Sequence, residues 1–294
     1  MAVGPSVYTG RFAPSPTGPL HLGSLLTALA SWLWARHAGG EWLVRIEDLD
    51  PPREPPGAAL SILANLRAHG LSHPSPVLWQ STRCSAYDAA VRQLLATGEA
   101  FHCTCSRQDL LAGEHAAQCP QSVDPPSEPA AVRVRIGTGT VGFDDEILGK
   151  VRAPVSADSF VVQRRDGLYS YHLAVVVDDA FQRVSHIVRG RDLLDSTPYH
   201  LRLQELLGLS RPAYAHLPLL LNEDGQKLSK QAHAAALDDS RAHENIRRCL
   251  RALGQTLPPA DGSDSVQALL DTAIARWEPR RIPRDDVDAA SLPG

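Results

Sequence analysis

The chain has 294 residues, of which 43% are hydrophobic and 21% are charged, and its net charge is −4. This is an ordinary globular composition, long enough for one large α/β domain with an insertion or for two modest domains. The negative net charge argues against a protein that binds nucleic acid non-specifically, although basic stretches at 247–251 and 280–284 leave a specific RNA contact open. No apolar run approaches the roughly 20 residues of a membrane span and no signal segment begins the chain, so we expect a cytoplasmic protein without membrane contact.

The first part of the chain predicts a β-α-β unit. Residues 7–12 are expected to form a strand, and a loop rich in Pro and Gly leads to an apolar helix over 22–37. The next stretch, WLVRIEDLD, predicts the second strand. Helices are then expected over 57–69 and 85–97.

The pattern changes after residue 100. Short β-rich pieces at 131–136 and 160–165 replace the earlier alternation and predict an insertion of mixed structure. α/β character resumes with SYHLAVVVDDAF and the strand RVSHIVRG, and a helix with Pro198 in its first turn follows, opened by the capping residue types of DST. Helical pieces are expected at 242–253 and 264–277.

The loop RFAPSPTGPLHLGS, residues 11–24, joins the first strand to the first helix. Ligand sites form at this place in an open parallel sheet, and amides at a helix N-terminus favour anions. The loop is not GxGxxG, but Gly18 and Gly23 allow close approach of the backbone, and His21 offers ring nitrogens to a phosphate oxygen. By itself, HLGS is more typical of an ordinary helix start.

Lysine is scarce in this chain. Of 29 basic residues only Lys150, Lys227 and Lys230 are lysines, and two of them lie three apart in QKLSK. A compact ammonium is a point charge suited to phosphate, which the planar arginine fork does not replace. Two solvated lysines in a loop are the ordinary interpretation of KxxK, but the strand and loop at 7–24 favour phosphate binding.

Three of the five cysteines, Cys103, Cys105 and Cys119, lie within 17 residues. An odd number of cysteines does not suit a disulfide framework. Together with His115 the three thiols offer four ligands at a spacing that suits one structural, tetrahedral Zn²⁺. His102 is an alternative fourth ligand, and three free thiols in a core are the alternative to a metal.

Four segments, in the order of the family, resemble the glutamyl branch of the class I aminoacyl-tRNA synthetases. They are RFAPSPTGPLHLGS, which looks like the HIGH region, RIEDLD at 45–50, the stretch 169–209, and KLSK, which looks like the KMSKS loop. The resemblance covers roughly residues 1–240, and RFAPSPTG is similar to the glutamate-specific rather than the glutamine-specific branch. It implies a ligase-type enzyme that uses ATP to convert L-glutamate into glutamyl adenylate.

The resemblance also implies the domain organisation. A Rossmann-like catalytic domain of the α/β class would be divided between residues 1–100 and 166–225. An inserted mixed α/β subdomain of the acceptor type, over 101–165, would carry the zinc ligands. Residues 226–294 would hold the KMSKS-type loop and a short helical stem-contact piece, without an anticodon-binding domain.

Glutamate needs cations for two carboxylates and acceptors for its ammonium. By resemblance, its pocket consists of Arg11, Phe12, Ala13, Pro14, Ser15, Glu47, Tyr171 and Arg189. The resemblance assigns ATP binding to His21, Gly23, Lys227, Ser229 and Lys230. Of these, His21, Lys227 and Lys230 would be catalytic, because they stabilise charge on the phosphoryl oxygens, and Mg²⁺ is expected with ATP. Taken singly, such arginines are more often surface ion-pair partners.

The choice of acceptor depends on the length of the chain. Only 63 residues follow Gln231, too few for a stem-contact piece and a further domain. This resembles the truncated paralogues in the family, which need no tRNA for activation and esterify glutamate onto queuosine at the wobble position of tRNA(Asp). The expected partners are ATP, L-glutamate and this tRNA, and we expect a monomer. Two alternatives are a minimal synthetase that charges the tRNA 3′ end and an inactive paralogue that binds RNA, although intact His21, Gly23, Lys227 and Lys230 argue against the second.

Overall fold

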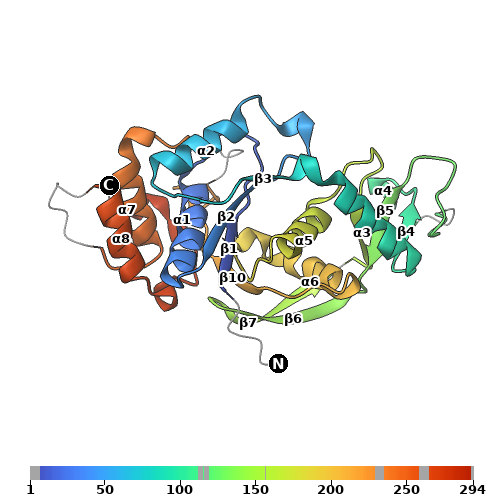
Figure 1. Ribbon diagram of the computed structural model, residues 1–294. Coiled ribbons are helices and arrows are strands. Elements are labelled where there is room, and N and C mark those ends of the chain that lie inside the picture. The colour runs from blue at the N-terminus through green and yellow to red at the C-terminus, as the bar shows by residue number, and fades with distance from the viewer. Residues whose placement is uncertain are drawn as a thin grey trace.

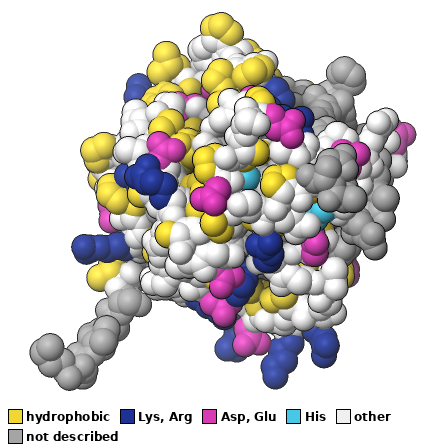
Figure 2. Space-filling view, turned by 90° about the vertical axis from the view of Figure 1, so that its right-hand side faces the viewer, with side chains coloured by type: hydrophobic (Ala, Val, Ile, Leu, Met, Phe, Trp, Pro, Cys, Tyr) yellow, Lys and Arg dark blue, Asp and Glu magenta, His cyan; other side chains and the backbone are white. Residues whose placement is uncertain are grey.

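The computed structural model describes residues 7–111, 115, 119–155, 157–228, 235–257 and 265–292. Figure 1 shows an elongated molecule with helices α7 and α8 beside α1 at one end and strands β4 and β5 at the other. On the face that carries this second end, charged side chains of both signs are interspersed with hydrophobic ones (Figure 2). None of the described helices combines the length and the apolarity that crossing a membrane requires.

The predicted β-α-β unit is confirmed. Strands β1 (Thr9–Phe12) and β2 (Glu41–Ile46) pair in parallel, helix α1 (Leu22–His37) connects them, and β3 (Leu78–Trp79) continues the sheet beyond β2. Strand β2 ends at Ile46, earlier than WLVRIEDLD predicts, because the amide of Glu47 donates to the carbonyl of Pro14 (3.0 Å). The end of β2 is therefore tied to the loop that follows β1.

A second sheet has the strand order β7-β6-β10-β9. Strands β9 (His186–Gly190) and β10 (Ala213–Leu217) are parallel, and the antiparallel hairpin of β6 (Gly139–Asp145) and β7 (Gly149–Val155) joins β10 through Tyr214 and Asp145. Contacts between β9 and β1 place this sheet next to the first one. The hairpin lies within residues 101–165, so the range predicted as an insertion divides between two sheets.

The third sheet is antiparallel and lies at the far end of the molecule (Figure 1). It contains β4 (Ala100–Cys103), β5 (Ala131–Arg135) and β8 (Ser159–Gln163). The strand predicted over 160–165 stops at Gln163 because the amide of Arg164 donates to the carbonyl of Leu168 (2.7 Å) and closes a turn. The short helix α4 (Arg107–Leu111) follows β4.

The helices predicted from periodicity are confirmed with small shifts at their ends. They are α2 (Ala58–Ala68), α3 (Cys84–Ala96), α7 (Ala242–Ala252) and α8 (Val266–Ala275). The helix predicted with Pro198 in its first turn is α6 (Thr197–Leu206), and α5 (Tyr171–Phe181) lies in the stretch where only a return of α/β character was predicted. Helix α6 begins at Thr197 after a 3-10 turn, η3 (Arg191–Ser196), and the Ser196 side chain forms no capping hydrogen bond, contrary to the expectation from DST. The other short elements are η1 (Pro51–Arg53), η2 (Gln80–Arg83), η4 (Asp239–Arg241), η5 (Pro279–Arg281), η6 (Ala289–Ser291), and the paired strands β11 (Leu220–Leu221) and β12 (Val287–Asp288).

Two hydrophobic cores support the two ends of the molecule. In the larger one, α1 is buried between the first sheet and the C-terminal helices, where Ile246 and Leu250 of α7 and Leu269 of α8 are fully or almost fully buried. Each such side chain contributes about 1.5–3 kcal/mol on burial, so α7 and α8 are part of the same folded unit as the first sheet. The second core joins α3, α5 and α6 to the third sheet.

Candidate active site

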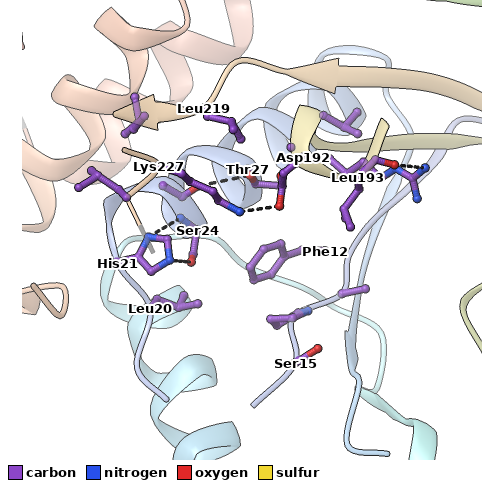
Figure 3. Close-up of a pocket in the computed structure, with 18 of the residues that line it drawn as sticks. Phe12, Ser15, Leu20, His21, Ser24, Thr27, Asp192, Leu193, Leu219 and Lys227 are labelled. Atoms are coloured by element: carbon purple, nitrogen blue, oxygen red, sulfur yellow. Dashed lines mark hydrogen bonds and ion pairs between the residues drawn. The ribbon is translucent and has the colours of Figure 1, made fainter. Parts of the chain in front are cut away.

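A cavity of about 330 Å³ opens between the end of β1, the start of α1 and the residues that follow β9 (Figure 3). All eight residues predicted to bind glutamate line it: Arg11, Phe12, Ala13, Pro14, Ser15, Glu47, Tyr171 and Arg189. Three residues of the predicted ATP site, His21, Gly23 and Lys227, line the same cavity. Ser229 and Lys230 lie outside the described residues.

Arg11 is buried and held by a carboxylate that the sequence analysis did not identify. Its Nε lies 3.1 Å from Oδ1 of Asp179 and its Nη2 lies 3.4 Å from Oδ2, while Nη2 of Arg45 lies 2.8 Å from the same Oδ1. Burial acts to raise the pKa of Asp179, but the two guanidiniums outweigh it and lower that pKa. Nη1 of Arg11 has no partner within the described part of the chain, so it is the donor left for a ligand in the cavity.

Glu47 is the buried carboxyl group of the site. Its Oε1 lies 3.7 Å from Nη2 of Arg45 and forms no hydrogen bond with any described residue. Burial raises its pKa to about 7, although Arg45 and Arg11 act in the opposite direction. A buried acceptor without a donor is costly, and the ammonium of a ligand would remove that cost.

Arg189 is held by a network of neutral groups. Its Nε donates to Nε2 of His216 (3.1 Å), its Nη2 donates to Oγ1 of Thr197 (2.9 Å), and its Nη1 lies 3.0 Å from Nδ1 of His200. The one long contact, 3.4 Å, runs from Nη1 to the hydroxyl of Tyr171. Since no carboxylate pairs directly with Arg189 among the described residues, its charge is available to a ligand carboxylate.

The start of α1 lies next to these groups. His21 is the N-cap residue: its Nδ1 accepts from the amide of Ser24 (3.3 Å), and its Nε2 lies 3.1 Å from the Ser24 hydroxyl, as Figure 3 shows. A Cβ added at Gly23 would lie 3.2 Å from the His21 ring, so the ring would have to move away by a few tenths of an ångström. Glycine therefore keeps the ring close to the helix amides.

Lys227 reaches over the cavity to Asp192, and its Nζ lies 2.5 Å from Oδ2 (Figure 3). Both side chains are more than a third exposed. A solvent-exposed ion pair contributes at most about 1 kcal/mol to stability. An anionic ligand can therefore replace Asp192 as the partner of the ammonium at little cost.

The predicted metal ligands come together at the end of the molecule that carries β4 and β5. Nδ1 of His115 lies 3.5 Å from the sulfur of Cys103 and 3.6 Å from the sulfurs of Cys105 and Cys119, and the four ligand atoms lie within 4.8 Å of one another. Tetrahedral zinc, with bonds of about 2.3 Å to sulfur and about 2.0 Å to nitrogen, requires sulfur–nitrogen separations of about 3.5 Å. The donor set fits this metal, and the cluster contains His115, not His102.

The residues that support the site were missed in the sequence. They are Arg45, Asp145, Asp179, Asp192, Thr197, His200 and His216. One signal was visible, because VVVDDAF places two acids in an otherwise apolar helix, and buried carboxylates need cationic or hydrogen-bonding partners. The other supporting residues meet partners from distant parts of the chain, so no local sequence pattern indicates them.

Comparison with known proteins agrees with this geometry. The family model for the catalytic domain of class I tRNA synthetases (E and Q) matches residues 7–128 and 114–252. A glutamyl-Q tRNA(Asp) synthetase from Xanthomonas axonopodis pv. citri is 51% identical over 282 residues, covering 94% of this chain and 93% of the relative. One from Pseudomonas aeruginosa PAO1 is 49% identical over 292 residues, covering 98% of each chain.

Solved structures support the fold assignment. The glutamate-tRNA synthetase from Elizabethkingia anophelis superposes with a TM-score of 0.78 at 27% identity, covering 96% of this chain and 68% of that one. A glutamate tRNA ligase from Elizabethkingia meningosepticum, solved in complex with its amino acid, has the same TM-score and identity and covers 97% and 67%. The predicted α/β fold and ligase class are thereby confirmed, and the chain belongs to the class I tRNA synthetases of the E and Q type and, within them, to the glutamyl-Q tRNA(Asp) synthetase family.

Proposed function

We propose that this protein activates L-glutamate with ATP in the absence of tRNA and transfers it to queuosine at the wobble position of tRNA(Asp). The observation that carries the proposal is the cavity in which two buried guanidiniums, a buried carboxylate and a helix N-terminus converge. Relatives about half identical to this chain are named glutamyl-Q tRNA(Asp) synthetases, which supports this proposal. The site fits a small zwitterion with two carboxylates next to a polyphosphate.

Glutamate is bound by complementary charge. We assign its two carboxylates to Arg11, through the unpartnered Nη1, and to Arg189, whose Nη1 donates one proton to His200 and makes only a long contact with Tyr171 through the other. We assign its ammonium to Oε1 of Glu47, the acceptor without a donor. The loop residues Phe12, Ala13, Pro14 and Ser15 line the same cavity and set its shape.

Activation needs no nucleophile from the protein. A carboxylate oxygen of glutamate attacks the α-phosphorus of ATP, a new oxygen–phosphorus bond forms, and the bond to the β-phosphate oxygen breaks as pyrophosphate leaves. His21, Lys227 and Lys230 stabilise the charge on the phosphoryl oxygens, and Gly23 and Ser229 contribute to ATP binding. Lys227 exchanges its partner Asp192 for phosphate in this step. Mg²⁺ accompanies ATP and neutralises part of its charge.

The metal site has a structural role in this proposal. Cys103, Cys105, His115 and Cys119 would hold zinc, which ties the end of β4 to the chain that follows it. We assign residues 1–100 and 166–225 to the catalytic domain, 101–165 to the acceptor-type subdomain, and 226–294 to the KMSKS-type loop and the stem-contact region. The protein acts as a monomer in the cytoplasm, where its tRNA is found.

The proposal is tested in two assays. Glutamate-dependent ATP–pyrophosphate exchange is expected without tRNA, and tRNA(Asp) that carries queuosine is expected to accept glutamate, whereas the same tRNA without queuosine is not. Acylation of the queuosine diol should protect it from periodate. Exchange that requires tRNA, or an ester mapped to the 3′ end, would identify a minimal glutamyl-tRNA synthetase. Absence of exchange under all conditions would identify an inactive paralogue.

A further inference from the structure

A buried chain of hydrogen bonds connects Asp145 to His172, and the activation step uses only its middle member, Arg189. Asp145 lies at the end of β6, and its Oδ2 is 2.6 Å from Nδ1 of His216. Nε of Arg189 donates to Nε2 of His216 (3.1 Å), and Nη1 of Arg189 lies 3.0 Å from Nδ1 of His200. The chain ends where Nε2 of His200 lies 3.2 Å from Nδ1 of His172.

The order of donors determines where each proton lies. Arginine only donates, so Nδ1 of His200 must accept from Arg189, and the proton of neutral His200 is on Nε2. That proton is donated to Nδ1 of His172, which leaves the proton of neutral His172 on its own Nε2. Burial and the charge of Arg189 lower the pKa of His200 well below 6.5 and that of His172 to about 4, so both rings are neutral near pH 7.

His172 lines a second space, which its neighbour Tyr171 lines as well as the cavity. A cleft of about 1550 Å³ lies beside the smaller cavity and is lined by His172 but not by Arg189 or His200. The cavity and the cleft share three lining residues, Ser15, Glu47 and Tyr171, so they are adjacent. Nε2 of His172 has no hydrogen-bond partner among the described residues.

The cleft also reaches the cysteine cluster, since Cys103 and Cys105 line it together with Arg133, Arg164 and Arg165. The wall carries both charges, because four carboxylates accompany its arginines: Glu47, Asp50, Glu54 and Asp166. Arg164 pairs with two of them, Asp50 and Asp166. A polar space of this size next to the reaction centre is suited to a polyhydroxylated nucleoside rather than to an amino acid. His172 follows directly after Tyr171, one of the residues that line both spaces.

We propose that His172 is an acceptor-binding residue, which donates its Nε2 proton to a hydroxyl oxygen of a polyhydroxylated nucleoside, and that His200 is the positioning residue that keeps the proton on that nitrogen. The proposal rests on the proposed function for the identity of the nucleoside. Because Nε2 is already protonated, His172 does not accept the proton of the attacking hydroxyl. Its contribution is to bind and orient the acceptor against the adenylate.

The position of the proton is measured on the free protein by ¹⁵N NMR of the imidazoles. Wild type should show His172 as the Nε2–H tautomer. His200→Gln should keep it, because the amide oxygen accepts from Arg189 and the amide nitrogen donates to His172. His200→Leu removes both functions and should give a mixture of tautomers. A wild-type Nδ1–H tautomer, or no change in His200→Leu, would overturn the positioning role whatever the enzyme acylates.

The binding role is measured with the queuosine-containing tRNA. His172→Phe keeps the ring but loses the donor, and kcat/KM for the tRNA should fall about 10- to 100-fold while glutamate-dependent pyrophosphate exchange changes less than about threefold. His172→Gln restores a donor and should recover most of the loss. His73→Gln, in a loop outside both spaces, is the matched control and should keep both activities.

Equal transfer by His172→Phe and wild type would overturn the binding role. A parallel loss of exchange and transfer would also overturn it, because it would indicate a general structural effect. If wild type itself did not acylate this tRNA while the tautomers were as expected, the proposed function would fail. The binding role would then be measured with whichever RNA the enzyme does acylate, by the same comparison of variants.

Discussion

Replacing Glu47 by Gln should make the protein more stable and less active. In the free enzyme, burial raises the pKa of Glu47 from 4.5 to about 7. The folded protein therefore favours the protonated side chain, whereas glutamate binding needs the ionised one as the partner of its ammonium. Glutamine has nearly the same size and stays neutral, so Glu47→Gln separates the two demands.

The effect on stability follows from linkage. A carboxyl group whose pKa is raised in the folded state contributes stability below the pKa of the unfolded state, 4.5, and that contribution is lost as pH rises through about 7. The ionised Glu47 thus costs up to about 3 kcal/mol above pH 7, at about 1.4 kcal/mol per pKa unit. Glu47→Gln should raise the melting temperature by about 6 °C at pH 8 and by little at pH 5.

The effect on activity has the opposite sign. Losing a charge-assisted hydrogen bond to the ammonium should lower kcat/KM for glutamate about 10- to 100-fold in pyrophosphate exchange at pH 8. Wild-type kcat/KM should also fall about tenfold per pH unit below pH 7 as Glu47 is protonated, and this titration should be absent from the variant.

Melting curves at pH 5 and pH 8 and exchange rates between pH 6 and pH 8 measure both effects. The matched control is Glu205→Gln, which changes an exposed glutamate on α6 and should show neither effect. A Glu47→Gln protein that is less stable than wild type at pH 8 would refute the argument from burial. A wild-type kcat/KM that is constant between pH 6 and pH 8 would refute the assignment of Glu47 to the ammonium.

Three further outcomes are expected. Asp179→Asn leaves two buried guanidiniums without their shared counter-ion, so urea denaturation should show a loss of about 3–5 kcal/mol, and an unchanged midpoint would contradict the ion network. Lys230→Arg should lower both kcat and kcat/KM in exchange about 10- to 1000-fold with little change in glutamate binding, whereas full activity would mean that phosphate does not require the lysine. Metal analysis should find one zinc per chain, retained in His102→Ala and lost in His115→Ala, and metal-free wild type would remove the site.

Local sequence patterns predicted several elements closely. Helix α1 has the bounds predicted from its apolar run, and β1, β5, α2, α3 and α7 agree to within about two residues at their ends. The loop 11–24 and the isolated Lys227 were recognisable because their residue types and spacing suit phosphate. All these features depend on residues that are neighbours in the chain.

Pairings between distant segments depended on the tertiary structure. The hairpin β6–β7 lies inside the range predicted as an insertion, yet it joins β10, some 70 residues later, because Asp145 and Tyr214 pair across the two strands. In the same way, the spacing of the cysteines allowed either His102 or His115, and only the fold brings Nδ1 of His115 within 3.6 Å of all three sulfurs.

The supporting residues of the site show the physical reason most clearly. Asp179 meets Arg11 across 168 positions of sequence, and Asp145 meets His216 across 71. A buried charge is tolerated only where a partner compensates it, and which partner is available depends on how the strands and helices pack. The sequence by itself determined the local elements and the chemical types of the binding groups, whereas packing decided which charges are paired and which face the cavity.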